Sequence, residues 1–385
     1  MARYRGPLWS ALGIASAVLL CAPAFVAAQS SATTSKAGSA PASNSAAQAA
    51  NAKSAGSGKA WVMPRTADGH PDFSGYWNQL TFTPMERPAK YGNREFLTKE
   101  EMEQVFKSGV RGSYDPGAAG SEDRYGGELF NPDSVDYDAA TYGLSPWQNG
   151  IQPNPRTSLV VDPPDGRIPP LTEEAKARLA KGTRPGGGFP YVVDDHHGGA
   201  TVHADNARDL GQGTSCVTQS GGPPLTPPEY NAGVFIAQNT DSIVIETETG
   251  SEFRVIPLTT RPHVGANIHQ WHGDSRGHWE GDTLVVETTN MRPDHTYRNG
   301  QPDTEKITEY FTRTSAGTIE YKFTVNDPAT WTRPWSAIIP LSASTGPMFE
   351  YDCSEDNNDA VNILAGARAD ERKAAGKPAG PISQK

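Results

Sequence analysis

The sequence predicts a mainly β protein: an antiparallel meander that closes into a lipocalin-like barrel, with irregular N-terminal wrapping and a few short helices. Three observations lead to this prediction. At least seven short segments have the composition of strands, they follow one another at hairpin spacing, and tight turns such as 239–241 and 315–317 join them. A meander with one apolar face protects its edges best by closing on itself. A sandwich or a propeller fragment is the alternative, although a propeller needs a repeat of about 40 residues, which the sequence lacks.

Periodicity of two defines the strands. The clearest is 318–325, where Ile319, Tyr321, Phe323 and Val325 share one face and the residues between them are polar. In the segment 283–289, Leu284, Val286 and Thr288 share a face in the same way. The full set of expected strands is 157–161, 234–238, 242–248, 252–258, 283–289, 306–313, 318–325, 335–341 and 348–353.

Three helices are expected, at 96–107, 172–181 and 358–369. Thr98 and Thr172 are suitable N-caps, and acidic residues follow each in the first turn, where the helix dipole favours them. The aromatic segment 61–77 is too rich in Pro and Gly for a helix, so we expect it to lie extended over the core. Residues 109–155 and 182–207 are expected to be irregular.

The N-terminal residues have the pattern of a secretory signal. Arg3 and Arg5 precede a short apolar run, and small residues precede a cleavage position after Ala28. We therefore expect a signal peptide at 1–28, a disordered Ala/Ser-rich linker at 29–60, one β-rich domain at 61–369 and a disordered tail at 370–385. Within that domain, 61–214 is the wrapping region, 215–353 the meander and 354–369 the C-terminal helix. The expected location is periplasmic or secreted, with no transmembrane segment after signal removal.

The net charge excludes some classes of partner, and the cysteine content predicts a disulfide. The formal net charge is −10, and loss of Arg3 and Arg5 would make it more negative, which argues against nucleic acid or an anionic membrane as a partner. Two of the three cysteines, Cys216 and Cys353, lie beyond the signal. In an exported protein a disulfide between them is the first expectation, and two buried thiols are the alternative.

Several motifs, taken in order, resemble one family of proteins. They are PRTADGHPDFSGYW, DPPDGRIPPLTEEAKARLA, GDSRGHWEGDTLVVETTN and DPATWTRPW. Together they resemble a family of exported bacterial proteins of unsettled function, and the resemblance extends from Trp61 to about Arg368. It implies a single domain outside the cytoplasm and carries over no catalytic residue.

The segment 261–290 holds the densest group of chemically active side chains. Histidine beside a carboxylate suits acid–base catalysis, because His titrates near working pH, and it also suits a divalent metal, a possible cofactor. Turn-capping imidazoles and an ion pair of Arg276 that fixes the loop are the structural alternatives. The candidate catalytic residues are His269, His272, Asp274, Arg276 and His278, and the candidate metal ligands are His269 and His272.

Two further segments are candidates for ligand binding. The polar loop 194–205 carries three histidines that would complete a site if the loop faced 261–290. In the motif DPATWTRPW, alternate positions on a strand would put an arginine between two indoles, as a cation–π platform or as a structural latch. The candidate ligand-binding residues are Trp271, Trp279, Trp331, Arg333, Trp335, His196, His197 and His203.

These observations favour an exported β-barrel that binds or processes a small apolar or aromatic molecule. The catalytic version uses the histidines in a hydrolase, lyase or isomerase reaction, with or without a metal. The alternative is a ligand- or glycan-binding protein of the cell envelope without turnover. An enzyme requires at least two of these polar groups to converge in one site, and this criterion separates the two hypotheses.

Overall fold

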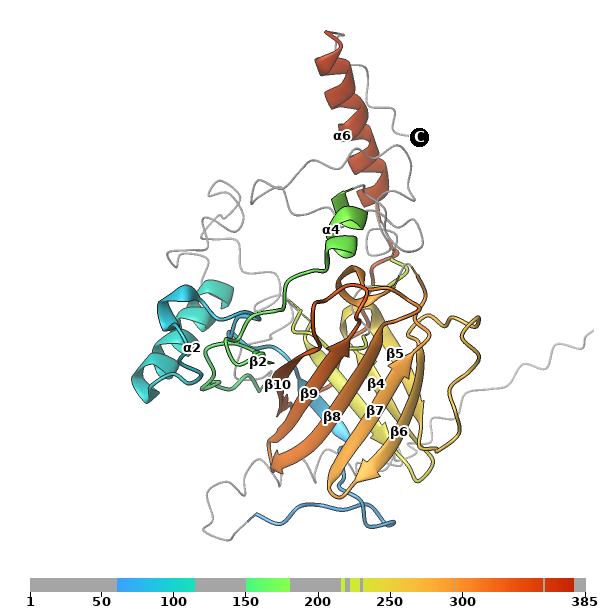
Figure 1. Ribbon diagram of the computed structural model, residues 1–385. Coiled ribbons are helices and arrows are strands. Elements are labelled where there is room, and N and C mark those ends of the chain that lie inside the picture. Colours follow the sequence, from blue (N-terminus) through green and yellow to red (C-terminus); the bar gives the residue numbers. More distant parts are fainter. Residues whose placement is uncertain are drawn as a thin grey trace, which may run out of the picture. The chain divides into compact units, whose positions relative to one another are not determined.

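The computed structural model describes residues 61–114, 150–180, 216–218, 222–228, 231–293, 295–355 and 357–376 (Figure 1). These residues belong to one of two compact units of the chain, Ser43–Lys385, which is described here by itself.

Nine strands form a nearly closed antiparallel barrel, which confirms the mainly β prediction. Their order around the wall is β5-β4-β3-β1-β10-β9-β8-β7-β6, and in Figure 1 β9, β8, β7 and β6 lie side by side in the front wall. A further strand, β2 (Val160–Asp162), pairs with β10 outside this path. The nine strands are β1 (Gly75–Asn78), β3 (Gly233–Gln238), β4 (Ser242–Thr247), β5 (Glu252–Pro257), β6 (Asp274–Glu280), β7 (Thr283–Thr289), β8 (Lys306–Ser315), β9 (Thr318–Asn326) and β10 (Trp335–Ala343).

The barrel closes between β5 and β6, and these two strands run parallel. An odd number of strands in an antiparallel path leaves its two ends pointing the same way, so the closing pair cannot be antiparallel. In the described residues the closure consists of a parallel bridge between Leu258 and Gly277 and a hydrogen bond of 3.0 Å from the Thr259 N–H to the Gly277 carbonyl. A Cβ at Gly277 would lie 2.9 Å from the Leu258 side chain, so glycine permits this close approach.

Alternation along the strands fills the barrel with side chains. The largest fully buried residues include Trp77, Trp335, Tyr321, Phe311 and Phe323. As expected, Leu284, Val286 and Thr288 are buried on one face of β7. Filled interiors are usual for small barrels, and here they confine any ligand of appreciable size to the ends of the barrel.

The two ends of the barrel differ, and we name each by a residue. At the His272 end, β5, β6, β8 and β10 begin and β4, β7 and β9 finish. At the Trp279 end, the N-terminal segment lies against the β6–β7 turn: His70 stacks on Trp279 with ring centroids 4.5 Å apart, and Arg65 forms an ion pair of 2.8 Å with Asp282.

The described helices are α2 (Lys99–Tyr114), α4 (Glu173–Ala180) and α6 (Asp359–Ala374), with 3-10 turns η2 (Ala89–Tyr91), η7 (Thr249–Ser251) and η8 (Tyr297–Asn299). Thr98 caps α2 as expected: its hydroxyl accepts from the Glu101 N–H at 3.2 Å, and the Glu101 carboxylate accepts from the Thr98 N–H at 2.8 Å. Thr172 likewise accepts from the Ala175 N–H at 3.1 Å. Among the helices of the described ranges, none is long and apolar enough to cross a membrane.

Five expectations about elements were wrong. Residues 348–353 form no strand, because their backbone N–H groups bond to side chains such as Glu248 and Ser251 instead of to a neighbouring strand. The segments 75–78 and 274–280, expected in an extended covering and in a loop, are strands of the wall. Helix α2 continues through 109–114, and α6 continues through 370–374 with an Arg368–Glu371 pair of 2.8 Å. The rest of 109–155 up to residue 149, and the tail beyond 376, lie outside the described residues.

Candidate functional site at the His272 end

A charged network lies inside the barrel, just below the His272 end. Arg254 on β5 donates two hydrogen bonds, of 2.8 and 2.7 Å, to the two carboxylate oxygens of Glu309 on β8. The Tyr321 hydroxyl donates to Glu309 at 2.9 Å and accepts from the Leu225 N–H at 2.9 Å. The side chains of Arg254 and Glu309 are 2% and 0% exposed, so this ion pair is fully desolvated.

Burial and the nearby charges change the pKa values of Arg254 and Tyr321. Burial lowers the pKa of Arg254, but the charge and hydrogen bonds of Glu309 outweigh it and raise that pKa. Burial, and then the negative charge of Glu309, raise the pKa of Tyr321 well above its usual value. Arg254 is therefore charged, and the Tyr321 phenol is neutral.

His272 lies above this network, directly before β6. Its Nδ1 lies 2.9 Å from the Gly222 carbonyl, and its Nε2 lies 3.4 Å from Oε2 of Glu252, the first residue of β5. The Thr218 hydroxyl approaches both carboxylate oxygens of Glu252, at 2.8 and 2.7 Å. Burial, followed by His295 and Arg254, lowers the pKa of His272 to about 4, while Glu252 acts in the opposite direction. His272 is therefore neutral at pH 7.

Aromatic rings surround this histidine. The His295 ring stands edge-on to the His272 ring at 5.3 Å and is stacked with Trp271 at 5.5 Å. The Arg292 guanidinium lies 4.4 Å from the centroid of a Trp271 ring. All four side chains are partly exposed, so this group borders solvent, whereas the Arg254–Glu309 pair does not.

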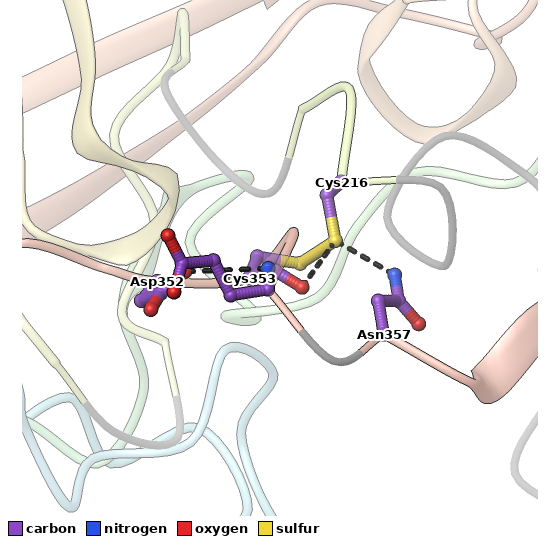
Figure 2. The surroundings of a disulfide bond; sticks show 5 residues. Cys216, Asp352, Cys353 and Asn357 are labelled. Carbon is purple, nitrogen blue, oxygen red and sulfur yellow. Dashed lines mark hydrogen bonds between the residues drawn. A yellow bond between two sulfur atoms is a disulfide. The ribbon is translucent and has the colours of Figure 1, made fainter.

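The segment after Cys216 holds both His272 and Glu252 in place. Thr218 contacts Glu252 and Gly222 contacts His272. The predicted disulfide between Cys216 and Cys353 is present, and Figure 2 shows the Asn357 amide pointing at the sulfur of Cys216, at 2.8 Å. We call residues 216–218 and 222–228 the strap; the disulfide attaches it covalently to the C-terminal segment.

Asp274 organises the rest of the histidine-rich loop on the outside of the wall. Its carboxylate accepts from His263 Nδ1 at 2.8 Å and the Val264 N–H at 3.1 Å, and it forms an ion pair of 2.8 Å with Arg276. His269 points its Nδ1 at the Met291 carbonyl, 2.9 Å away. These contacts fix the loop that carries His272.

The remaining candidates lie elsewhere. His278 is exposed and lies 3.2 Å from Glu280. Trp279 belongs to the opposite end of the barrel, where it also stacks on Phe73. The structure thus brings His272 and Trp271 together at one end, and it keeps His278 and Trp279 away from them. The loop 194–205, with His196, His197 and His203, lies outside the described residues.

The expected arginine between two indoles does not form. Strand β10 begins only at Trp335, so residues 331–335 do not alternate along one strand face. Trp331 and Trp335 pack edge-to-face in the core at 6.0 Å, while the half-exposed Arg333 pairs with Asp162 at 2.8 Å. The two indoles therefore support the barrel wall and leave Arg333 at the surface.

In the described ranges, no group of three or more His, Cys, Asp or Glu side chains is arranged to hold a metal ion. The predicted metal ligands His269 and His272 each direct Nδ1 at a carbonyl oxygen, that of Met291 and that of Gly222 respectively.

Comparison of the chain with protein-family models, curated proteins and solved structures finds no match.

Sequence reasoning missed most of the residues that surround His272. Glu252, Arg254, Tyr321 and His295 were not among the candidates. Glu309 carried a signal, because it interrupts the otherwise apolar face of 307–311 with a charge. On β5 the alternation of apolar and charged residues is misleading, because it would place the apolar residues inside the barrel. Phe253 and Val255 instead point outward, at 64% and 54% exposure, while Arg254 is buried.

Proposed function

We propose that this protein binds a small aromatic molecule at the His272 end of the barrel and transfers a proton there through His272 and Glu252. The observation that carries the proposal is the orientation of the His272 ring. A carbonyl can only accept, so Nδ1, 2.9 Å from the Gly222 oxygen, carries the proton. Nε2 is then an acceptor that faces the Glu252 carboxylate at the partly exposed edge of the site.

This arrangement suits general base catalysis. The ring of His272 is neutral at pH 7, so its Nε2 lone pair can accept a proton, and the charge of Glu252 raises the pKa of the ring against the effect of burial. The Glu252 carboxylate, 3.4 Å from Nε2, stabilises the imidazolium that forms when the proton arrives. The Gly222 carbonyl holds the tautomer, which is the role of the third group in a catalytic triad. Trp271 and His295 give this site an aromatic border.

Hydrolysis of 4-nitrophenyl acetate by the full chain tests the proton transfer. General base catalysis contributes about 10² or more to a rate, so His272→Gln should remove most of the rate above buffer. The rate of the wild type should reach its plateau above pH 5, since the pKa of His272 is about 4. The matched control is His70→Gln at the Trp279 end, which should keep the rate.

A rate in the His272→Gln protein equal to that of the wild type would contradict the catalytic proposal. Retained binding of aromatic molecules would then favour the ligand-binding alternative.

Export is part of the same proposal. Its support is the N-terminal pattern that ends at Ala28 together with the Cys216–Cys353 disulfide, because disulfides persist in oxidising compartments. Expression in a bacterial host, followed by fractionation and N-terminal sequencing, should find a chain that starts at Gln29 outside the cytoplasm. A full-length chain in the cytoplasmic fraction would contradict it.

A further inference from the structure

The strap lies in the His272 end of the barrel without belonging to its wall. Leu225 is fully buried in the core, and its N–H donates to the Tyr321 hydroxyl at 2.9 Å. Nδ1 of His272 lies 2.9 Å from the Gly222 carbonyl. In the described residues, no backbone–backbone hydrogen bond joins the strap to a strand of the wall. A displacement of the strap therefore breaks none of the described ladders of the barrel.

The two ends of the strap are anchored in different ways. On its C-terminal side the chain continues into β3, which begins at Gly233 and is paired on both edges. On its N-terminal side the Cys216–Cys353 disulfide is the covalent anchor, and it spans a sequence separation of 137. Without that bridge, noncovalent contacts alone must hold this long loop closed against its conformational entropy. Reduction therefore weakens the N-terminal anchor and leaves β3 in place.

Residues close to the bridge contact polar groups of the site. Thr218, two positions after Cys216, places its hydroxyl 2.8 and 2.7 Å from the carboxylate oxygens of Glu252. Gly222 determines which nitrogen of His272 carries the proton, because a carbonyl accepts and cannot donate. When the ring loses such a partner, both of its tautomers become accessible. The position of the strap thus determines the tautomer of His272.

The bridge is within reach of a thiol in solution. Both cysteines are partly exposed, and Val217 beside Cys216 is 53% exposed. The segment that carries Cys353 forms no strand, and the Tyr351 N–H donates to the Ser251 hydroxyl at 3.0 Å. Exposed disulfides exchange readily with dithiols, whereas typical structural disulfides resist reduction. The location of this bridge therefore suits reversible reduction.

We propose that the Cys216–Cys353 disulfide is a redox switch: its reduction by a dithiol releases the strap, and His272 loses the carbonyl that fixes its tautomer. The inference rests on the proposed function and names a regulation of the same site. A thiolate of the dithiol attacks one sulfur of the bridge, and the second thiol of the reagent then displaces that sulfur from the mixed disulfide. The S–S bond of the protein breaks and that of the oxidised dithiol forms. Two protons and two electrons pass from the dithiol to the two cysteines.

Nitrogen NMR of the intact chain tests the switch directly. With isotope-labelled histidine, the shifts of the two ring nitrogens report which one carries the proton, and His272→Gln assigns the signals of His272. The oxidised protein should show His272 protonated at Nδ1. Dithiothreitol should convert it to a mixture of both tautomers, and removal of dithiothreitol in air should restore it. His70, at the Trp279 end, is the internal control and should keep its signals.

A locked variant and an activity assay complete the test. Cys216→Ser/Cys353→Ser should show the tautomer mixture with or without dithiothreitol, which excludes an effect of the reagent on other groups. For the assay, the reduced thiols are blocked with iodoacetamide so that they cannot attack the ester. Steady-state hydrolysis of 4-nitrophenyl acetate should then fall about tenfold or more, because a histidine in the wrong tautomer is a poor base. Circular dichroism establishes that each form is folded.

The outcomes separate this inference from the proposed function. A folded, reduced protein with His272 still protonated only at Nδ1 overturns the switch. Loss of the β signal in circular dichroism on reduction also overturns it, because the bridge then holds the whole fold together. A reversible change of tautomer supports the switch even where the rate does not follow it. In that case the proposed catalytic role of His272 fails instead.

Discussion

Arg254 on β5 and Glu309 on β8 meet across the interior of the barrel through two hydrogen bonds of 2.7 and 2.8 Å. Such a desolvated pair contributes little net stability while both partners are present, but one partner left alone is an uncompensated buried charge. Glu309→Gln should therefore lower the free energy of unfolding by about 3–5 kcal/mol, measured by urea denaturation.

The matched double variant tests that explanation. Arg254→Met combined with Glu309→Leu removes both charges and should be less destabilising than the sum of the two single changes. Arg65→Gln breaks the exposed pair with Asp282 and should leave the free energy of unfolding nearly unchanged. Strictly additive effects of the two interior changes would show that the two residues are not coupled.

Stability should fall on acidification because of His272. Its pKa in the folded protein is about 4, below the ordinary value of 6.5, so the unfolded chain binds the proton more readily. This contribution is complete above pH 6.5 and is lost as pH falls from 6.5 towards 4. Thermal unfolding between pH 4 and 7 should show a shallower slope for His272→Gln than for the wild type. His70→Gln should retain the wild-type slope, and identical slopes in all three proteins would contradict the assignment.

Glu305 should produce the opposite dependence at higher pH. Burial raises its pKa well above the usual carboxyl value; the Tyr297 N–H acts against this and the charge of Asp327 adds to it. The folded protein thus holds this proton more tightly than the unfolded chain, and stability is lost as pH rises from about 4.5 through the raised pKa. Glu305→Gln should unfold at a higher temperature relative to the wild type at pH 8 than at pH 4. Asp303→Asn, an exposed neighbour, serves as the control.

Loss of the disulfide should disturb the His272 site as well as the fold. The bridge closes a loop with a sequence separation of 137, for which the loop-entropy relation gives about 5 kcal/mol. It also anchors the strap, whose Thr218 and Gly222 hold Glu252 and His272. In Cys216→Ser/Cys353→Ser, an NMR titration should show the pKa of His272 moving up from about 4 towards 6.5 as the ring becomes more hydrated. An unchanged pKa of His272 in the folded double variant would show that the disulfide-anchored strap does not determine the environment of His272.

The sequence predicted most of the strands whose neighbours along the chain are also their neighbours in the wall, and β6 is the exception. Strands 306–313 and 318–325 form the β8–β9 hairpin, and 283–289 matches β7. Local alternation and turn residues were sufficient there. Strand β1 is only four residues long and pairs with β3 and β10, both far away in sequence, so its local pattern carried no signal.

The candidate site was predicted only in part, for a similar physical reason. His272 and Trp271 were found because histidine and tryptophan are conspicuous in a Gly-rich loop. The rest of the site, with the buried network below it, comes from β5, β8, β9 and the strap, and only closure of the barrel brings those elements together. The sequence did not predict β6, because its segment DSRGHWE has no alternation of apolar and polar residues. The outward side carries Asp274, Arg276 and His278. The inward side carries Ser275 and Gly277, which are not large apolar residues.

The parallel junction between β5 and β6 is the weakest junction in the wall of the barrel. Every other junction in the wall is a ladder of paired residues, whereas the described part of this one has a single bridge at Leu258 and Gly277. The circumference is therefore least constrained along this line, which starts at Glu252 and His272. Native-state hydrogen exchange should find the amides of β5 and β6 opening before those of β8 and β9, so that the barrel widens first beside the site proposed to admit the ligand.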